Sequence, residues 1–249
     1  MHLSVIIPAY NEEKRLPKTL AEIDGYLRKQ NYPSTGSGGS DYEIIVVSDG
    51  SKDKTAEVAK NLQGQIKNLR VIDNKENHGK GYVTRQGMLE AKGDYRIFTD
   101  ADNSTSIDQV EKMWPEFQKG YDVVIGSRDI KGAVLDPPQP WLRNIILGEG
   151  FKLFRKIFIG LWGIQDTQCG FKGLTKAATE KVFPKCKIDR FAFDPEILVL
   201  ARKMGYKIKE IPVYWKNDPD SKVKFKSMVN MTIDIIKIRW NSIRGQYGK

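Results

Sequence analysis

Apolar residues in the first half of the chain form two patterns that alternate along the sequence. Short runs rich in Val and Ile predict strands at residues 3–8, 42–47, 69–73, 95–99 and 122–126. Helically spaced apolar positions predict helices at residues 12–29, 54–62, 81–91 and 107–118. Nearly continuous apolar strands separated by amphipathic helices indicate an α/β fold, with a mostly parallel central sheet and helices on both faces.

Polar clusters directly follow three of the predicted strands. They are Pro8-Ala9-Tyr10-Asn11-Glu12, Ser48-Asp49-Gly50-Ser51 and Asp100-Ala101-Asp102. In a parallel sheet, ligands bind beyond the carboxyl ends of the strands, so the three clusters predict one shared site. The alternative is that each cluster only forms a turn, because Asp-Gly-Ser and Pro-x-x-Asn are common turn formers.

Asp100 and Asp102 are the strongest indication of chemistry. Two carboxylates one residue apart at a strand end suit a hard divalent cation that carries a diphosphate, and therefore a nucleotide-activated substrate. A solvated turn is the alternative interpretation, because acidic pairs are common at loop starts.

The second half departs from this alternation after Arg128. Phe151, Phe154, Phe158 and Trp162 recur at helical spacing among basic residues, as expected for a core helix or for a helix at a membrane surface. Residues 224–244 form a second candidate of the same kind, with Ile235, Ile238 and Trp240 among several bases. Residues 33–40 lack any packing side chain and read as a flexible loop.

Composition excludes several classes of protein. The 249 residues are 40% apolar and 29% charged, and no apolar run approaches the roughly 18 residues of a membrane span. The N-terminus lacks a basic region before its short apolar run, so we expect no signal peptide and a cytoplasmic location. Two cysteines and two histidines exclude a Cys/His zinc framework and make a disulfide scaffold improbable.

The net charge of +10 indicates an anionic partner, such as nucleic acid, a phosphorylated substrate or a lipid headgroup. We expect no nucleic acid, because zinc-finger spacing and RNP1-like or Arg/Gly-rich segments are missing from the sequence. Neither a P-loop nor Gly-x-Gly-x-x-Gly after a strand is present, which disfavours ATP and NAD chemistry.

Taken in order, the motifs resemble family 2 glycosyltransferases of the GT-A fold. Besides the three clusters, Asn77-x-Gly79-Lys80-Gly81 and Gly126-Ser127-Arg128 occur at the family's approximate spacing. The chain is most similar to the polyprenyl-phosphate hexose synthases, typified by dolichyl-phosphate glucosyl- and mannosyltransferases. The resemblance implies one domain over residues 1–249, in which residues 1–128 bind the nucleotide sugar and residues 129–249 face the acceptor and the membrane. Amphipathic C-terminal helices complete the expected fold.

The second half is similar to the dolichyl-phosphate glucosyltransferase branch. The shared segments are Asp166-Thr167-Gln168-Cys169-Gly170-Phe171-Lys172, Phe193-Asp194-Pro195-Glu196, Pro212-Val213-x-Trp215 and Ser221-Lys222-Val223. This favours UDP-glucose over GDP-mannose as donor. Ser48 stands where many relatives have an aspartate, Asn103 replaces a common glycine, and Ser104 falls where the mannosyl branch has a glutamine metal ligand.

The resemblance also assigns roles to single residues. The nucleotide sugar would be bound by Pro8, Tyr10, Glu12, Val47, Asp49, Lys80, Asp100 and Ala101. Mg²⁺ or Mn²⁺ would be held by Asp100 and Asp102, with Asp102 as the direct ligand whose loss nearly abolishes turnover. The acceptor phosphate would be bound by Arg128, Arg143, Lys172, Ser221 and Lys222, of which Arg128 and Lys222 are the catalytic candidates beside Asp102.

A lipid monophosphate needs no dedicated base, because its second pKa lies near 6 and it is already largely a dianion at neutral pH. The site must instead align two anions, a task suited to Arg128 and Lys222. Asp194 and Glu196 have the alternative interpretation of a hydrolase acid–base pair, but we expect them to orient the acceptor side or to bind Arg190 or backbone amides. We expect His78 to contact phosphate or to be exposed.

The sequence therefore predicts a metal-dependent, inverting hexosyltransferase that is peripheral on the cytoplasmic face of an anionic membrane. It would form a β-linked polyprenyl-phosphate sugar. The alternatives are a family member that uses GDP-mannose or a glycan acceptor, and a nucleotide-sugar-binding scaffold without turnover.

Overall fold

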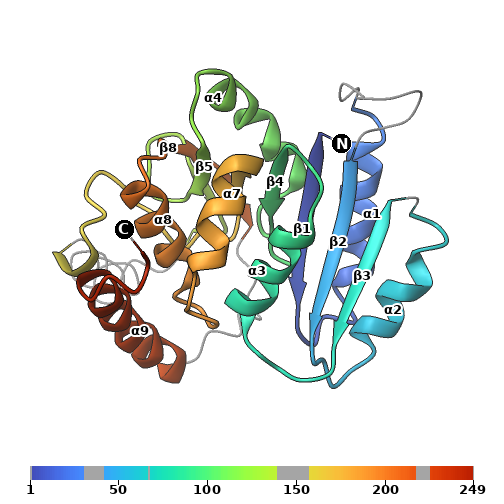
Figure 1. Ribbon diagram of the computed structural model, residues 1–249. Coiled ribbons are helices and arrows are strands. Elements are labelled where there is room, and N and C mark those ends of the chain that lie inside the picture. Colours follow the sequence, from blue (N-terminus) through green and yellow to red (C-terminus); the bar gives the residue numbers. More distant parts are fainter. Residues whose placement is uncertain (1, 31–41, 67, 139–156, 217–224, 249) are drawn as a thin grey trace.

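The computed structural model describes residues 2–30, 42–66, 68–138, 157–216 and 225–248 (Figure 1). The strands are β1 Leu3–Ala9, β2 Tyr42–Asp49, β3 Leu69–Asn74, β4 Tyr95–Phe98, β5 Val123–Ser127, β6 Val134–Asp136, β7 Lys172–Thr175, β8 Ile208–Pro212 and β9 Tyr214–Lys216. The α-helices are α1 Leu16–Leu27, α2 Thr55–Leu62, α3 Lys80–Glu90, α4 Trp114–Gln118, α7 Lys176–Val182, α8 Phe193–Lys203 and α9 Phe225–Ile243, and the 3₁₀-helices are η1 Ile107–Lys112 and η3 Phe183–Lys185.

Seven strands form one sheet in the order β3-β2-β1-β4-β7-β5-β8. All neighbours in it are parallel except β7, which runs antiparallel to both β4 and β5. From β1 the chain first builds outward through β2 and β3 and then returns to add β4 on the other side of β1. The order of the strands reverses between β1 and β4, and ligands bind at such a reversal, beyond the carboxyl ends of the strands.

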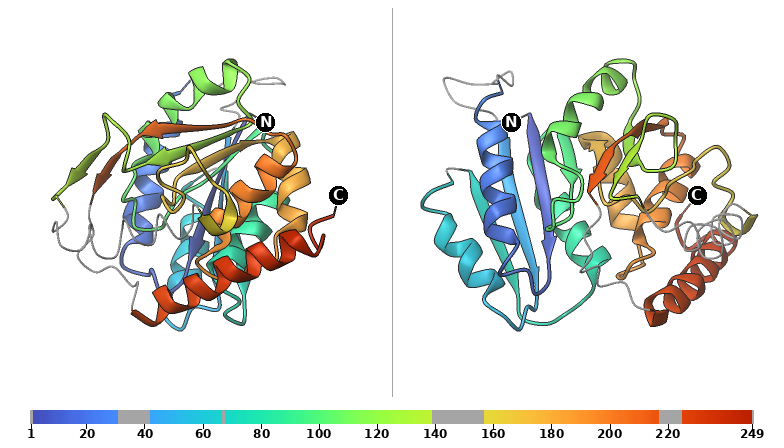
Figure 2. Two further views of the ribbon diagram at one scale, coloured as in Figure 1. Left: turned by 90° about the vertical axis from the view of Figure 1, so that its left-hand side faces the viewer. Right: turned by 180° about the vertical axis from the view of Figure 1, so that it is seen from behind.

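Both faces of the sheet are covered, as expected. Side chains alternate along β1, so that Ile6 packs into one hydrophobic cluster while Val5 and Ile7 pack into the other. The first cluster includes residues of α3, α7, α8 and α9, and the second includes residues of α1, η1 and α4. Figures 1 and 2 show these two helical layers on opposite sides of the strands.

Two predicted helices differ in their extent. Residues 107–118 divide into η1 and α4, because Pro115 has no N–H to continue a helix and instead occupies the first turn of α4. The first helix starts at Leu16 rather than Glu12, again with a proline in its first turn. The remaining predicted strands and helices of the first half are present within a few residues of their expected bounds.

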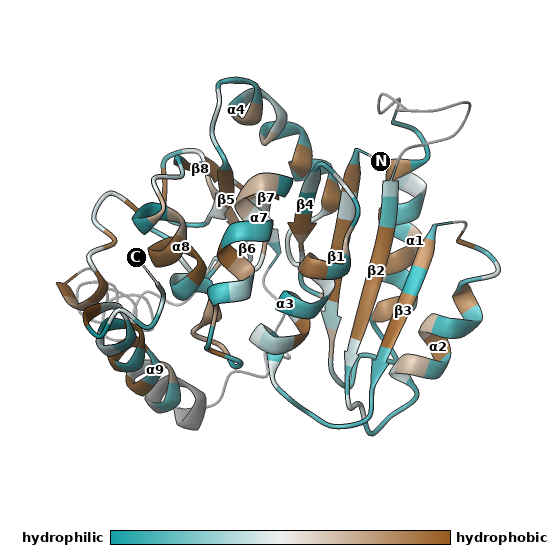
Figure 3. Cartoon of the chain, viewed as in Figure 1, coloured by the Kyte–Doolittle hydropathy of each residue, from teal (hydrophilic) through white to brown (hydrophobic). Residues whose placement is uncertain are grey.

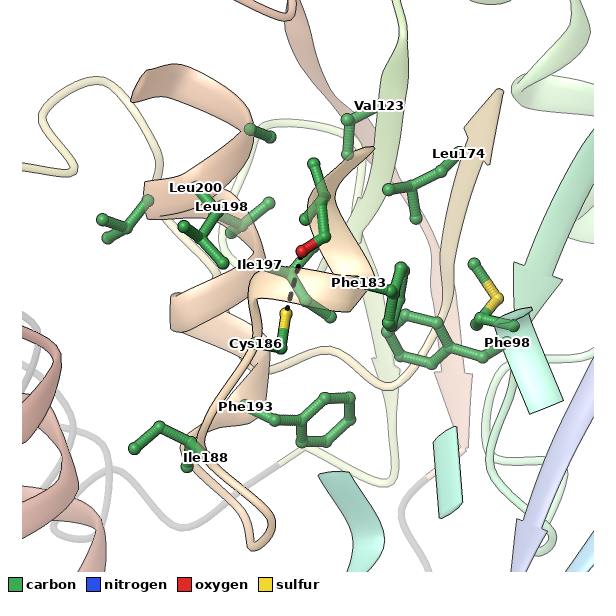
Figure 4. Close-up of a cluster of buried hydrophobic side chains, with 14 of the residues drawn as sticks. Phe98, Val123, Leu174, Phe183, Cys186, Ile188, Phe193, Ile197, Leu198 and Leu200 are labelled. Carbon is green, nitrogen blue, oxygen red and sulfur yellow. Dashed lines mark hydrogen bonds between the residues drawn. The ribbon is translucent and has the colours of Figure 1, made fainter. Parts of the chain in front are cut away.

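The end of β4 is packed against α8 by aromatic side chains. The rings of Phe98 and Phe193 lie with their centroids 5.6 Å apart. Figure 4 shows both within a buried cluster that also holds Phe183, Cys186 and Ile188. The cluster fixes the start of α8, and the segment 186–192 before it, next to β4. Asp100 follows this strand.

The C-terminal helix is α9, and it is amphipathic. Ile235 and Ile238 are fully buried, whereas Trp240 is exposed. Of the other aromatic stripe, Phe158 and Trp162 are exposed to 38% and 59%, which does not fit the core interpretation for these two residues. Phe151, Phe154 and the loop at residues 33–40 lie outside the described residues. Figure 3 shows apolar and polar positions alternating around α9.

Candidate functional site

Loops after β1 and β2 are joined by hydrogen bonds at the carboxyl edge of the sheet. The Asn11 N–H donates to Ser51 Oγ at 3.2 Å, and Lys52 N–H donates to Asn11 Oδ1 at 2.8 Å. Asn11 has a φ of 55°, a left-handed conformation that asparagine tolerates better than most residues. Two of the three predicted clusters therefore form one structure, rather than separate turns.

Asp49 connects these loops to the motif at residues 77–81. Its carboxylate accepts hydrogen bonds from the backbone N–H of His78 at 2.7 Å and of Gly79 at 2.9 Å, and from Asn77 Nδ2 at 2.9 Å. The side chain is nearly fully buried. Asp49 thus positions the start of α3, in addition to the nucleoside contact that the sequence predicts for it.

Lys80 is the first residue of α3, and its ammonium group binds the carboxylate of Asp100. Gly79 directly precedes it with a φ of 108°, a conformation open to glycine. His78 stacks on the ring of Tyr82 with centroids 4.4 Å apart. The motif at residues 77–81 therefore delivers a positive charge to the predicted cation site.

Hydrogen bonds from neighbouring residues fix the backbone of the third cluster. The hydroxyl of Thr19 donates to the backbone oxygen of Ala101 at 2.8 Å, and Ser104 N–H donates to Asp102 Oδ1 at 2.9 Å. Asn103, the residue that replaces a common glycine, has a φ of 54°, which accounts for the choice of a small polar residue there. Burial, followed by the charge of Asp100, raises the pKa of Asp102 above its ordinary value.

The two aspartates fit a divalent metal. They offer oxygen ligands only, which Mg²⁺ and Mn²⁺ prefer, and their mutual repulsion is what a bound cation relieves. Within the described ranges no cluster of three or more His, Cys, Asp or Glu side chains suits a metal ion. Mg²⁺ is commonly bound by one or two carboxylates, with water and substrate phosphate as the other ligands.

A buried ion pair lies behind Lys80. Lys172 in β7 is fully buried and binds both the Asp194 carboxylate and the backbone oxygen of Cys169. Burial raises the pKa of Asp194, while the charges of Lys172 and Lys80 oppose that rise. The structure thus gives Lys172 an internal partner, which leaves its predicted contact with an acceptor phosphate without support.

Arg128 is held by Asp166. Its Nε and Nη2 atoms donate to the carboxylate oxygens at 2.7 and 3.0 Å, and the Arg128 backbone N–H adds a third bond at 3.1 Å. The guanidinium also lies 5.4 Å from the ring centroid of Trp215. Arg128 holds the pKa of Asp166 well below its usual range, against the effect of burial. The pair fixes the orientation of Arg128 at the edge of the sheet.

The segment 166–170 joins Arg128 to the aspartates. Asp166 Oδ1 also accepts from the N–H groups of Gln168 and Cys169, which shapes the turn. Gly170 at its end lies so close to Asp100 that a Cβ atom there would overlap the carboxylate. This segment therefore links the two predicted sites: it binds Arg128 at one end and contacts Asp100 at the other.

The remaining residues predicted to bind the nucleotide sugar or the acceptor phosphate differ in their exposure and partners. Tyr10 is 36% exposed at the edge, whereas Val47 is fully buried within β2, between β1 and β3, which leaves its predicted contact with the nucleotide sugar without support. Glu12 pairs with Arg15 at 2.7 Å. Pro8 lies opposite Val47 in the β1–β2 pairing, one residue before that pairing ends at Ala9 and Ser48. The predicted phosphate contacts Arg143, Ser221 and Lys222 lie outside the described residues and stay predictions.

Glu210 is a contributor that the sequence did not reveal. It lies in β8 and accepts from the N–H groups of Gln165 and Asp166, both at 2.9 Å, and so supports the partner of Arg128. Asp194 was expected to orient the acceptor side or to bind Arg190 or backbone amides, but it binds Lys172, which lies 22 positions away in the sequence. The lysine at the start of β7, directly after Phe171, was the available signal for a buried charge.

The chain is similar to known proteins over most of its length. The sequence pattern of Glycosyl transferase family 2 matches residues 4–183. The chain is 38% identical to the dolichyl-phosphate beta-glucosyltransferase ALG5A of Trichomonas vaginalis over 96% of this chain and 73% of the relative. It is 36% identical to the human dolichyl-phosphate beta-glucosyltransferase over 98% of this chain and 77% of the relative.

Solved structures show the same fold. Mannosyl-3-phosphoglycerate synthase from Rubrobacter xylanophilus aligns with a TM-score of 0.69 at 16% identity, covering 99% of this chain and 75% of that one. Glucosyl-3-phosphoglycerate synthase from Mycobacterium tuberculosis, crystallised with Mn²⁺, UDP and phosphoglyceric acid, aligns with a TM-score of 0.63 at 16% identity, covering 99% and 78%. These neighbours confirm the predicted GT-A fold. Among the described residues, no helix is long and apolar enough to span a membrane.

Proposed function

The chain belongs to glycosyl transferase family 2, and on that premise we propose that it transfers glucose from UDP-glucose to a polyprenyl phosphate with inversion. The product is a β-linked lipid-phosphate sugar. The observation that carries the proposal is the similarity to dolichyl-phosphate beta-glucosyltransferases over almost the whole chain, including the half that follows Arg128. A similarity limited to residues 1–128 would not indicate which acceptor the enzyme uses.

On the donor side, the loops after β1 and β2 receive the nucleoside. Tyr10 offers a partly exposed ring after β1, and Asp49 ends the neighbouring strand β2. Asp100 and Asp102 would hold Mg²⁺ or Mn²⁺, which when bound offsets the charge that develops on the departing diphosphate. Lys80 adds a second positive charge at Asp100.

On the acceptor side, Arg128 is the residue best placed to orient a phosphate. Asp166 and Trp215 fix its plane, so little side-chain entropy is lost when a substrate is aligned. The acceptor is already largely a dianion at neutral pH, and so the site needs alignment rather than a proton acceptor. Lys222 is the second cation in this proposal.

An apolar stripe on α9 supports a peripheral membrane location. Its members recur at intervals of three, four and three residues and are 46% to 64% exposed: Ile233, Ile236, Trp240 and Ile243. Arg244 lies 4.2 Å from the Trp240 ring centroid and adds a basic group beside the stripe. Exposed apolar anchors next to cations are typical of helices that lie in a membrane interface.

Vesicle sedimentation tests this location. We expect the double substitution Ile236→Ser with Trp240→Ser to weaken binding to anionic vesicles at least about tenfold, because two inserted apolar side chains are lost. Leu89→Ser is the matched control, since Leu89 is 41% exposed on α3, outside the stripe. Equal binding of both variants and the wild type would remove α9 from the proposal.

An acceptor panel tests the function itself. Labelled UDP-glucose is incubated with the protein and polyprenyl phosphate, polyprenol or a soluble glycan, and GDP-mannose is the alternative donor. The proposal expects product from UDP-glucose and polyprenyl phosphate alone. Product on the glycan would favour the glycan-acceptor alternative, and binding of UDP-glucose without any product would favour a scaffold.

A further inference from the structure

Glu196 on α8 is a buried carboxylate that the proposed reaction does not use. It is fully inaccessible to solvent and accepts three hydrogen bonds. Two come from the backbone N–H groups of Lys187 and Ile188, both at 2.9 Å, and the third comes from the hydroxyl of Tyr247 at 2.7 Å. This confirms the expected binding to backbone amides and adds a partner from the C-terminal segment.

Tyr247 follows α9 and is itself buried, with 2% of its surface exposed. Asn241 of α9 donates to its hydroxyl at 3.4 Å. Burial and the neighbouring Glu196 raise the phenol pKa, so the group stays protonated and donates. Ordering a tyrosine against a buried carboxylate fixes the segment after α9 to α8 and to the loop at residues 187–189.

That loop packs directly against the N-terminus of α3. The backbone oxygen of Asp189 accepts from Tyr82 N–H at 3.1 Å, and Arg85 donates to the Asp189 carboxylate at 2.8 Å. The contact is too close for side chains at the facing glycines. A Cβ at Gly79 would overlap the Asp189 oxygen, and one at Gly81 would lie 2.5 Å from the Ile188 oxygen.

Lys80 stands between these two glycines and binds Asp100. We propose that Tyr247 is a positioning residue of the donor site, which acts through Glu196 to hold the backbone of residues 187–189 against α3 and thereby fixes Lys80 on Asp100. The identity of the donor as a UDP-sugar rests on the proposed function. The role of Tyr247 in positioning α3 does not depend on it.

The test compares Tyr247→Phe, which removes only the hydroxyl, with wild type. UDP affinity is measured by calorimetry with Mn²⁺, and amide hydrogen exchange is measured over residues 80–83 and 187–189. We expect UDP to bind about two- to thirtyfold more weakly, the range typical of residues that act through a packed network, and both segments to exchange faster. Tyr206→Phe is the matched control, because the Tyr206 hydroxyl donates to the Ala177 oxygen of α7 and does not reach the loop.

Steady-state kinetics separates positioning from general destabilisation. The Michaelis constant for the donor should rise in Tyr247→Phe, while that for the acceptor stays at the wild-type value. If Tyr247→Phe melts below the assay temperature, Glu196→Gln repeats the comparison. Lys187 and Tyr247 donate to one oxygen of Glu196 and Ile188 donates to the other, so glutamine, with a single acceptor oxygen, must lose at least one of the bonds that hold the loop.

Unchanged UDP affinity together with unchanged exchange over residues 80–83 would overturn the inference. Its failure is distinguishable from failure of the proposed function. If the wild type makes no lipid product, the lipid acceptor is rejected. Weaker UDP binding by Tyr247→Phe would still support the positioning role of Tyr247. If the wild type does not bind UDP, the exchange rates over residues 80–83 still decide whether Tyr247 positions α3.

Discussion

The carboxylate of Asp100 is partly exposed, and a neighbouring glycine lies against it on the protein side. Gly170 faces the carboxylate, and any Cβ there would overlap it. Lys80 binds the same carboxylate from the other motif. The site therefore has little tolerance for displacement of this side chain.

We expect Gly170→Ala to lower the transfer rate about 100-fold, the typical effect of moving a reacting group by about 1 Å. Gly25→Ala on α1 is the control, because a Cβ there meets no atom within 4 Å. The measurement is the initial rate at saturating donor, alongside the melting temperature of each variant. Equal rates for the two variants would show that the position of Asp100 is not critical.

The pair of Asp166 and Arg128 predicts a defined pH dependence of stability. The pKa of Asp166 is lowered in the folded protein from an ordinary value of 3.8, so its contribution is present above that value and is lost as the pH falls below it. We expect Asp166→Asn to cost about 3 kcal/mol of unfolding free energy at pH 7, because Arg128 loses its partner. The difference from wild type, measured by urea denaturation, should shrink as the pH falls from about 4 towards about 2. A gap that widens in acid would contradict the pairing.

At the residue scale, sequence reasoning located charges but not their partners. Asp49, Asp100 and Asp102 all lie at the predicted edge, since their positions follow from the strands that precede them. The internal partner of Lys172 was not predictable, because Asp194 approaches it only once β7 has been inserted beside β4.

At the element scale, the Lys172–Asp194 bond ties β7 to α8 behind the site. We expect Lys172→Met to cost about 3 kcal/mol of unfolding free energy, because it leaves a buried carboxylate without its nearest cation. Asp194→Asn in the same chain should restore at least about half of this loss, since the unpaired charge is removed. Urea denaturation of both single variants and the double variant measures the coupling. Strictly additive losses would contradict it.

The same elements show where pattern reading succeeds. Parallel strands with continuous Val and Ile runs were predictable, because burial on both faces leaves that signature. By contrast, β7 has only four residues, two of which are Lys172 and Gly173, and it joins the centre of the sheet as the antiparallel strand. Its place is set by long-range pairing with β4 and β5, which local periodicity does not record.

At the scale of the whole molecule, the proposed membrane location rests on the net charge of +10 together with the apolar stripe of α9. We expect binding to vesicles that contain anionic lipid to weaken several-fold as salt rises from about 0.05 to 0.5 M, because screening shortens the reach of the basic surface. Binding to neutral vesicles should be weak at every salt concentration. Salt-independent binding would show that insertion of the stripe alone is responsible.

The most direct test of the central claim is glucose transfer from UDP-glucose to polyprenyl phosphate in liposomes, with Mn²⁺ or Mg²⁺ and with chelator, for wild type and Asp102→Asn. A labelled glucosyl phosphoryl lipid should form with metal and be absent with chelator. Its rate of formation should fall at least about 100-fold in a folded Asp102→Asn variant. Transfer by Asp102→Asn at the wild-type rate, or no lipid product from a wild type that binds UDP-glucose, would contradict the claim.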